Sequence, residues 1–594
     1  MSNPTGPSPF SLKGLLIGTA LSAAVGLLAP FGLVFQYFRM GFNPSSQGAV
    51  CFFVVIVLVN VGVGLLGRRL ALPRADLILI YCMLLMAVTV PTWGLMFFLI
   101  GTMVYPYYYA TPENRFAELF HDLIPSWMAP QDMKAIEYYY EGLPKGAPIP
   151  WGPWLEPLGY WFALIMILGF MLICLSAILH RQWSVHERLT YPMLQVPQAM
   201  IEEKEGLPGS LAPLFKSKLM WIGFAVPLIY FSFAGLHHFF PAVPNASFFW
   251  DNLVWFRNTV RLVFAFSFAW VGFFYLASLE ITFSVWFFYL FCKAEEGVFS
   301  ILGVSSTEKL SLYEFSQPAD LTHQATGATI VFVLYVLWMA RGHLADVWAK
   351  VWSDPSEGID DSEELLRYRT ALIGFVGSLL FVAFWLWRSG VPLLVLPPLL
   401  AISLIFFILV ARATTTAGLA TARSPIVPAY FVISGFGASA IGAKGLVALD
   451  FTFTWQGESR TSPMVAASHG LKMAEQVRGP KSRLFWGMMI ALGCSFIGAA
   501  FMILTLCYKY GAINLSNINW AGAHGWPNIG PVMVDLPEAN IRGGCSRELV
   551  PRSPEPSCGL STGSTGGPSI HSGLPSASAG SPDTSGSPPS SRGV

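Results

Sequence analysis

Residues 76–104 read "DLILIYCMLLMAVTVPTWGLMFFLIGTMV", and this stretch decides which kind of fold the sequence predicts. It is long and apolar enough to cross a membrane, because about 20 apolar residues span the hydrocarbon core. In its middle, Pro91, Thr92, Trp93 and Gly94 interrupt the helical pattern. Discontinuous helices near the membrane midplane form substrate sites in many secondary transporters. We therefore take Pro91 and Trp93 as candidate site residues.

The whole chain has the composition of a membrane protein. Of its 594 residues, 54% are hydrophobic and only 12% are charged, which is half of the ~25% that is usual in soluble domains. The formal net charge of +1 argues against nucleic-acid binding, which requires a basic surface. We expect the lipid bilayer to be the main partner of the chain, and we expect no nucleic-acid partner.

Apolar runs of membrane-spanning length recur along the chain and predict an all-α polytopic bundle of about 11–13 helical elements. The stretch 425–455 differs, because it consists of two shorter apolar pieces on either side of Lys444. Short paired pieces with Gly and Pro favour a re-entrant or broken helix pair. The runs interpreted as spans cover residues 12–38, 49–67, 76–104, 158–180, 219–241, 262–278, 280–300, 327–341, 370–387, 391–411 and 484–508.

Lys and Arg in the connecting segments predict the orientation of the bundle, since cytoplasmic loops are enriched in both. They gather in 181–218, 342–369 and 456–483, and these segments are predicted to be cytoplasmic together with the N-terminus. The segment 105–157, rich in Tyr, Trp and Pro, then falls outside. It forms either an interfacial cap over the bundle or an ordinary outer loop. We expect a multi-pass protein of the inner (plasma) membrane.

Residues 186–203, "HERLTYPMLQVPQAMIEE", directly follow one of these apolar runs. Pro192 and Pro197 each lack a backbone N–H and disfavour helix before them. We expect the chain to turn here, dip back against the bundle and continue as a short helix. A plain amphipathic loop helix is the alternative. Together with the two prolines, Glu187 and Arg188 form our candidate cytoplasmic motif.

Polar side chains inside apolar runs are costly and mark candidate sites. Glu280, with Ser284 on nearly the same helical face, is our first candidate for a proton-carrying group, and Asp450 is the second. His237 and His238 end another run. Each has an alternative interpretation: Glu280 in a turn between two spans, Asp450 capping a half-helix, and the histidines at the outer membrane interface.

Motifs for enzymatic chemistry are missing from the sequence. "GASAIGAKG" (437–445) lacks the Gly-Lys-Ser/Thr ending of a phosphate-binding loop and is better explained by close helix packing. The 8 cysteines form no CxxC pair, so no zinc or redox motif is indicated. We expect no cofactor, no metal and no enzymatic activity. A membrane-embedded enzyme, with clustered acid, His or Ser groups, is the less favoured alternative.

The composition changes at about Gly543, after which Ser, Pro and Gly dominate. Such a segment cannot bury a core. We therefore divide the chain into a membrane domain (1–510), a post-membrane segment (511–542) and a disordered tail (543–594). Our hypothesis for the tail is an out-of-frame ending, and a natural disordered linker is the alternative.

Several stretches resemble a family of uncharacterised bacterial multi-pass membrane proteins, a domain of unknown function, over about residues 10–510: 72–96, 107–120, 138–158 and 278–291. In addition, "RQWSVHERLTYPMLQVPQAMIEE" (181–203) resembles the segment that follows a span in the oligopeptide transporter superfamily. The resemblance implies an oligopeptide-transporter-like bundle. It also implies proton-coupled secondary transport of a small polar solute, either peptide-like or a metal chelate. A non-transporting membrane scaffold or complex subunit is the alternative.

Overall fold

The computed structural model describes residues 9–36, 47–91, 93–202, 209–243, 250–256, 259–304, 319–352, 360–419 and 422–534. The predicted tail 543–594, and with it the out-of-frame hypothesis, lies outside these residues. Among the described residues the regular structure is helical apart from one two-stranded hairpin, which confirms the all-α prediction. Eight helices in this part of the chain are long and apolar enough to cross a membrane, so the protein is a multi-pass membrane protein.

The long helices are α1 (Leu12–Gln36), α2 (Gln47–Leu66), α7 (Gly152–Arg181), α10 (Lys218–Phe239), α12 (Leu279–Leu302), α13 (Ala319–Met339), α15 (Tyr368–Ser389), α16 (Leu396–Ala417) and α20 (Ser482–Tyr510). The shorter helices are α3 (Arg74–Ala87), α4 (Met96–Tyr108), α5 (Phe116–Phe120), α6 (Met133–Glu141), α8 (Gln195–Met200), α9 (Pro213–Lys216), α11 (Phe268–Leu276), α14 (Arg341–Trp352), α17 (Pro428–Phe436), α18 (Ala438–Gln456), α19 (Pro463–Ala474), α21 (Ser516–Gly522) and α22 (Trp526–Val534). Single turns of other helix types are η1 (His121–Leu123), η2 (Gln182–His186), η3 (Pro192–Leu194), η5 (Ser459–Thr461) and η6 (Ala512–Asn514).

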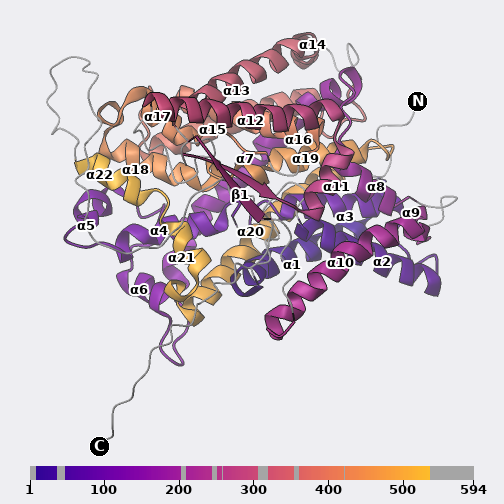
Figure 1. Ribbon diagram of the computed structural model, residues 1–594, viewed down its shortest axis with the longest axis horizontal. Coiled ribbons are helices and arrows are strands. Elements are labelled where there is room, and N and C mark those ends of the chain that lie inside the picture. Colours follow the sequence, from indigo (N-terminus) through magenta and orange to yellow (C-terminus); the bar gives the residue numbers. More distant parts are fainter. Residues whose placement is uncertain are drawn as a thin grey trace, which may run out of the picture.

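Short helices form the centre of the bundle, and long helices surround them. Nearly every residue of α3 and α19 is buried, as is the second half of α18. Around this centre, α1 and α20 pack against α3, and α7 packs against both α19 and α15 (Figure 1). Helices that are apolar on all sides are stable only when they are covered. The breaks between the short helices are tolerated at membrane depth because surrounding protein shields their backbone.

Glycine allows some of these helices to approach backbone to backbone. A Cβ atom added to Gly26 of α1 would lie only 2.7 Å from the carbonyl oxygen of Ser495 in α20. In the same way, a Cβ on Gly101 of α4 would lie 2.7 Å from the backbone nitrogen of Gly522 in α21. Small residues at such crossings let membrane helices gain close van der Waals packing.

The predicted interruption of 76–104 is confirmed, because α3 ends at Ala87 and α4 begins at Met96. Pro91 lacks the N–H that would continue the helix. The predicted broken pair in 425–455 is confirmed as well. Gly437, with φ 79°, separates α17 from α18, and Gly442, with φ 74°, kinks α18. Glycine adopts such positive φ angles without the steric penalty of a Cβ atom.

The sequence predicted the wrong kind of structure for two segments, 262–278 and 456–483. The expected span 262–278 is instead strand β2 (Val260–Ala265), which pairs with β1 (Trp250–Trp255), followed by the short helix α11. Short runs of β-branched and aromatic residues suit a strand as well as a helix, so the apolar pattern could not separate the two. The stretch 456–483 is not all loop, because it contains the buried helix α19.

The segment 105–157 packs onto the bundle as a cap. Its helix α6 contacts α4 and α20. Trp154, in the first turn of α7, donates a hydrogen bond of 2.7 Å to the hydroxyl of Tyr508 in α20, which in turn donates to the carbonyl oxygen of Ala135 in α6. These contacts attach the segment 105–157 to the ends of α7 and α20.

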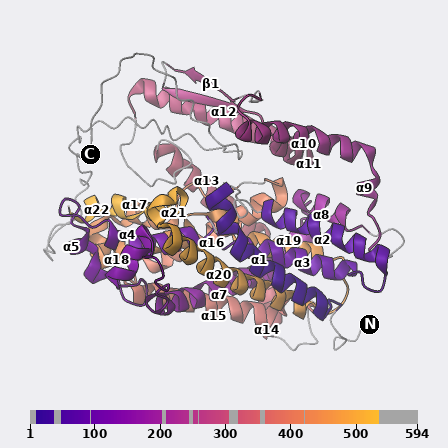
Figure 2. The ribbon, with the colours of Figure 1, turned by 90° about the horizontal axis from the view of Figure 1, so that it is seen from below.

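Residues of α10, α11, α12 and the β-hairpin form a separate outer layer, which Figure 2 shows on one side of the bundle. This layer is highly apolar but poorly covered. No residue of α11 is buried, and in α12 only Gly297 is. Both Glu280 and His237 belong to this layer, and so they lie outside the packed centre.

Candidate functional site

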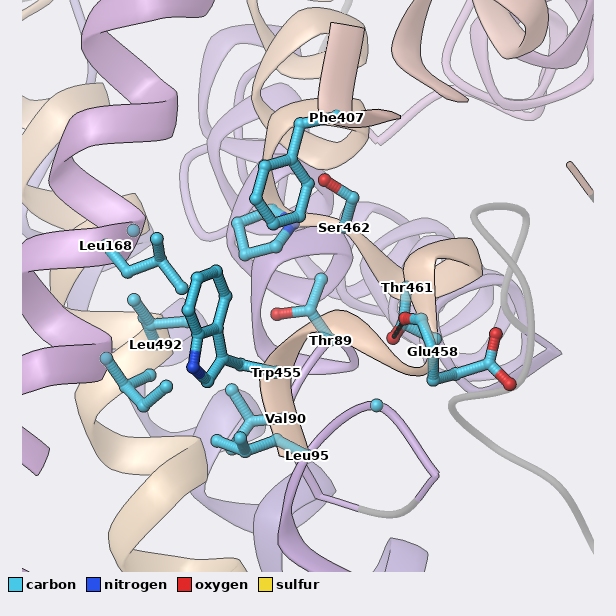
Figure 3. A pocket seen from close by; sticks show the side chains of 14 residues that line it. Thr89, Val90, Leu95, Leu168, Phe407, Trp455, Glu458, Thr461, Ser462 and Leu492 are labelled. Carbon is cyan, nitrogen blue, oxygen red and sulfur yellow. Dashed lines mark hydrogen bonds between the residues drawn. The ribbon is translucent and has the colours of Figure 1, made fainter. Parts of the chain in front are cut away.

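The two breaks at the centre of the bundle meet at a cavity of about 40 Å³ (Figure 3). The segment between α3 and α4 forms one side, and the segment between α18 and α19 forms the other. A Cβ on Gly94 would lie 2.6 Å from the hydroxyl of Thr461, so the two segments are in direct contact. The cavity is lined by Thr89, Val90, Gly94, Leu95, Ile165, Leu168, Gly169, Phe407, Trp455, Glu458, Thr461, Ser462, Pro463 and Leu492.

The cavity lies close to the middle of the bundle's long helices. Leu168 and Gly169 are near the midpoint of α7, and Phe407 is near the midpoint of α16. Because both helices are long enough to span the bilayer, their midpoints lie close to its centre. The cavity is therefore near the membrane midplane.

The size of the cavity limits what it can hold in this conformation. A cavity needs a volume of about 10–15 Å³ to hold one water molecule. The observed 40 Å³ admits a few waters or a small ion, but no peptide-sized solute. A larger ligand would require the walls of the cavity to separate.

Polar and apolar groups line different parts of the cavity. Figure 3 shows the ring of Trp455 beside Leu168 and Leu492, with the Glu458 carboxylate directed away from that ring. The hydroxyl-bearing residues Thr461 and Ser462 also line the cavity. A mixed lining of this kind is typical of ligand sites, where apolar walls carry a few placed polar groups.

Glu458 is the main charged group of the cavity. Its side chain has 0% exposure, and its Oε2 atom lies 2.7 Å from Nη2 of Arg423. Removing two charges from water is costly unless they pair closely. Nearby, the backbone N–H of Ser424 donates to the hydroxyl of Ser459, at 3.0 Å, and this bond holds the two segments together.

Local sequence explains how the break after α18 is built. Gly457 ends α18, and η5 forms a single turn over Ser459–Thr461. The Ser462 hydroxyl then accepts a hydrogen bond from the N–H of Met464, and Pro463 occupies the first turn of α19. Ser as N-cap followed by Pro is a typical helix start. This signal is present in "GESRTSP" (457–463), which lies inside the segment 456–483 that the basic residues predict to be a cytoplasmic loop.

Asp450 is buried in α18, with 3% exposure, but does not line the cavity. Neither of its carboxylate oxygens has a hydrogen-bond partner among the described residues. It lies against Gly525, where an added Cβ would fall 1.5 Å from Oδ1. Because Asp450 lies well inside α18 rather than at its start, the structure does not match the interpretation of a residue capping its own half-helix.

The remaining predicted site residues are dispersed. Pro91 is buried beside the cavity without lining it, and Trp93 packs edge-on against Phe98 at 5.8 Å. Glu280 is exposed in the first turn of α12, directly after the turn that separates α11 from α12. The Ser284 hydroxyl donates to the backbone oxygen of Glu280 rather than to its carboxylate.

The two histidines at the end of α10 are also away from the cavity. A ring nitrogen of His237 lies within hydrogen-bonding distance of the carbonyl oxygen of Val243. The side chain of His238 lies outside the described residues. Among the residues that the structure does describe, no group of three or more His, Cys, Asp or Glu is arranged to hold a metal ion.

The described part of the segment 186–203, residues 186–202, is docked on the bundle, as predicted, and is not a plain loop helix. Glu187 pairs with Arg412 of α16. Pro192 packs against Gly418, where an added Cβ would lie 2.7 Å from the proline ring. Pro197 is buried in α8, whereas Arg188 is exposed.

Comparison with known proteins identifies a family. The model of a family described as "Family of unknown function (DUF6785)" matches residues 4–542. The match ends one residue before Gly543, where the Ser-, Pro- and Gly-rich composition begins. No curated protein and no solved structure matches the chain. The resemblance to an uncharacterised family is thereby confirmed, and the likeness to oligopeptide transporters stays a prediction.

Proposed function

The chain belongs to this family of unknown function, and from its own site we propose that it is a secondary transporter of a small polar solute. The proposed solute is peptide-like or a metal chelate, and its transport is coupled to protons. The transport site is the cavity between the two helix breaks. The observation that carries this proposal is the meeting of both breaks at one cavity midway along α7 and α16.

The helix ends around the cavity support a solute that carries both signs of charge. The N-termini of α4 and α19 follow Leu95 and Ser462, and N-termini carry partial positive charge. The C-termini of α3 and α18 precede Thr89 and Glu458, and C-termini carry partial negative charge. A zwitterionic solute such as a short peptide fits this arrangement, in which its carboxylate faces the N-termini and its ammonium group faces Glu458.

The small volume of the cavity fits an empty, closed stage of a transport cycle, in which no solute is bound. Alternating access proceeds by movement of one part of a bundle against another around a fixed site. The two breaks supply short helices, α4 and α19, whose ends are not continuous with a long span. Such helices can shift without bending a whole membrane-spanning helix.

Asp450 is the favoured proton-carrying residue. A carboxylate without partners is very costly inside a membrane protein, so in this conformation the side chain carries a proton. Glu280, our first candidate, is exposed and lies in the outer layer. Glu458 already has a counter-charge in Arg423, so it is better suited to bind solute than to carry the proton.

A membrane scaffold would need no polar cavity at midplane depth, and its buried polar groups would be paired. The cavity lined by Glu458 and the unpartnered carboxyl group of Asp450 are the features that favour a transporter over a scaffold.

The test is uptake into vesicles that contain the purified full chain, with a library of short peptides and metal chelates and an imposed proton gradient. We expect Glu458→Gln to lower uptake at least about tenfold, since a charged hydrogen bond is worth roughly 1.5–3 kcal/mol. Asp450→Asn should leave uptake independent of the proton gradient. Glu118→Gln, which removes a surface pair with Arg115, is the matched control and should behave as the parent. The absence of uptake of any library member by folded protein would contradict the proposal.

A further inference from the structure

Two of the helices that wall the cavity, α7 and α19, extend from it to a common end of the bundle. From Leu168 in α7, the helix runs to His180, and from Pro463 in α19 the helix runs to Lys472. At 1.5 Å per residue these distances are about 18 Å and about 14 Å. Half of a hydrocarbon core is about 15 Å. The far ends of α7 and α19 therefore lie near one surface of the membrane.

A polar network joins α7 to α19 at this end. Glu475, immediately after α19, accepts hydrogen bonds from His180, at 3.0 Å, from Lys472, at 2.8 Å, and from the hydroxyl of Ser184. Lys472 also donates to that hydroxyl, at 2.7 Å. Burial alone would raise the pKa of the Glu475 carboxyl, but these bonds outweigh it and lower the pKa to about 2. The carboxylate is thus held firmly in its charged form.

A second set of contacts joins the same region to α16. Glu187 pairs with Arg412 and also accepts a hydrogen bond of 2.8 Å from the amide of Gln182. The backbone N–H of Tyr191 donates to the carbonyl oxygen of Thr415 at 3.1 Å. The segment that follows α7 is therefore attached to both α19 and α16.

The backbone of this segment departs from regular helix geometry. The end of α7 continues into the π-helical turn η2. Arg188 has a φ of 52° and Tyr191 a φ of 45°, and both are non-glycine residues in the left-handed region. Each such conformation costs about 1–3 kcal/mol and persists only where the surroundings enforce it. π-helical turns are frequent at functional sites.

We propose that these residues form a latch that seals the cavity on this face of the membrane. The latch consists of His180, Gln182, Ser184, Glu187 and Tyr191 together with Arg412, Lys472 and Glu475. The proposal rests on the proposed function, because a gate serves a transport path. When the latch opens, α7, α16 and α19 separate at this end and solute reaches the cavity. Water can replace the polar contacts of the latch near the membrane surface, and release of the strained backbone favours its opening.

The opposite end of the bundle is closed in a different way. There the cap segment 105–157 covers the helices through buried aromatic residues. Trp161 of α7 donates to the carbonyl oxygen of Met128 at 3.0 Å and packs edge-on against Trp385 of α15, at 4.9 Å. Water cannot replace large apolar contacts in the way that it replaces the polar contacts of the latch. The latch end is therefore the one that opens more readily.

The test measures how fast a small water-soluble thiol reagent modifies Leu168→Cys in the cavity, with the reagent added to one side of vesicles that contain the full chain. The parent protein without Leu168→Cys gives the background from the native cysteines. In the Leu168→Cys background, Glu475→Gln and Glu187→Gln should each speed modification about tenfold from the latch face, since each removes a charged hydrogen bond. Modification from the opposite face should not change.

Glu296→Gln is the matched control. Glu296 pairs with Lys293 outside the latch at 2.7 Å, with the same three-residue spacing as Lys472 and Glu475 and a similar distance. The double variant Glu187→Gln with Arg412→Gln leaves no buried charge without a partner, so it should remain folded and react fast. Slow modification in that double variant, or equal acceleration from both faces, would overturn the latch. Labelling requires no transported solute, so fast labelling without any uptake would reject only the proposed transport.

Discussion

Nη2 of Arg423 lies 2.7 Å from Oε2 of Glu458, and Glu458 is one of the residues that line a cavity at the centre of a membrane bundle. Arg423 lies between α16 and α17, and Glu458 lies between α18 and the turn η5, so the pair links two connecting segments. Its position makes the pair a support for the break between α18 and α19, and in the proposed transport Glu458 is the charged group that faces the solute.

The pair should show strong energetic coupling. We expect Arg423→Met alone to lower the free energy of unfolding by about 3–5 kcal/mol, because it leaves Glu458 buried without its counter-charge. Adding Glu458→Gln should recover most of that loss. Thermal or denaturant unfolding of the two single variants and the double variant in detergent would measure the coupling. Additive losses would show that the two side chains do not act as a pair.

Gly94 should tolerate no side chain. A Cβ at this position would lie 2.1 Å from the carbonyl oxygen of Thr89 and 2.6 Å from the hydroxyl of Thr461, so Gly94→Ala forces the two breaks apart. We expect a clear drop in unfolding temperature together with loss of uptake. Gly159→Ala in α7 is the control, because no atom lies within 4 Å of the added Cβ. That variant should be neutral or slightly more stable, as expected for Ala in a helix.

The crossing of α1 and α20 should depend on Gly26. Gly26→Val places a branched side chain where the backbone of Ser495 lies only 2.7 Å from the added Cβ. We expect poor recovery of folded protein or a loss of roughly 1–3 kcal/mol from overpacking. Gly62→Val in α2, where the space around the Cβ is open, should be recovered like the parent. Size-exclusion profiles and unfolding temperatures provide the measurement.

The latch should contribute to stability in a pH-dependent way. Folding lowers the pKa of Glu475 from its ordinary value of 4.5 to about 2. A lowered carboxyl pKa adds stability above its unfolded value, and this stability is lost as the pH falls from about 4.5 towards 2. When the pH drops from about 6 to about 3, the unfolding temperature of the parent should therefore fall further than that of Glu475→Gln. Parallel curves for the two proteins would contradict this assignment.

The orientation predicted from the basic residues can be tested with single cysteines at exposed positions. Lys134→Cys, in the segment 105–157, should react with an impermeant reagent from outside the cell. Ser362→Cys, in the segment 342–369, should react only after the membrane is opened. The reverse pattern would invert the whole topology, and with it the face on which the latch lies.

Much of the architecture follows from local sequence. Apolar run length marks the spans, because a helix must cross about 30 Å of hydrocarbon. Pro91 predicts the break in 76–104, and glycine with proline predicts the broken pair around α18, because these residues alter the backbone wherever they stand. The prediction failed at 262–278, where a six-residue strand and a short helix carry the same apolar pattern as a span.

The candidate site followed from the sequence only in part. A polar residue within an apolar run stands out, and so Asp450 was found, but Glu280 stood out in the same way and is exposed. Glu458 escaped notice because it lies in a polar stretch, where a carboxylate is unremarkable. Its burial arises from the packing of α7, α16 and α20 around the break.

The sequence by itself determined that this is a multi-pass membrane protein with interrupted helices, because hydrophobic length and backbone chemistry are local properties. Only the tertiary structure decided which interruptions meet, which carboxylates are buried, and which charges pair. Glu187 with Arg412, and His180 with Glu475, are separated by more than two hundred residues in the chain. Such contacts depend on how whole helices cross, and crossing is set by side-chain packing over the entire bundle rather than by any one segment.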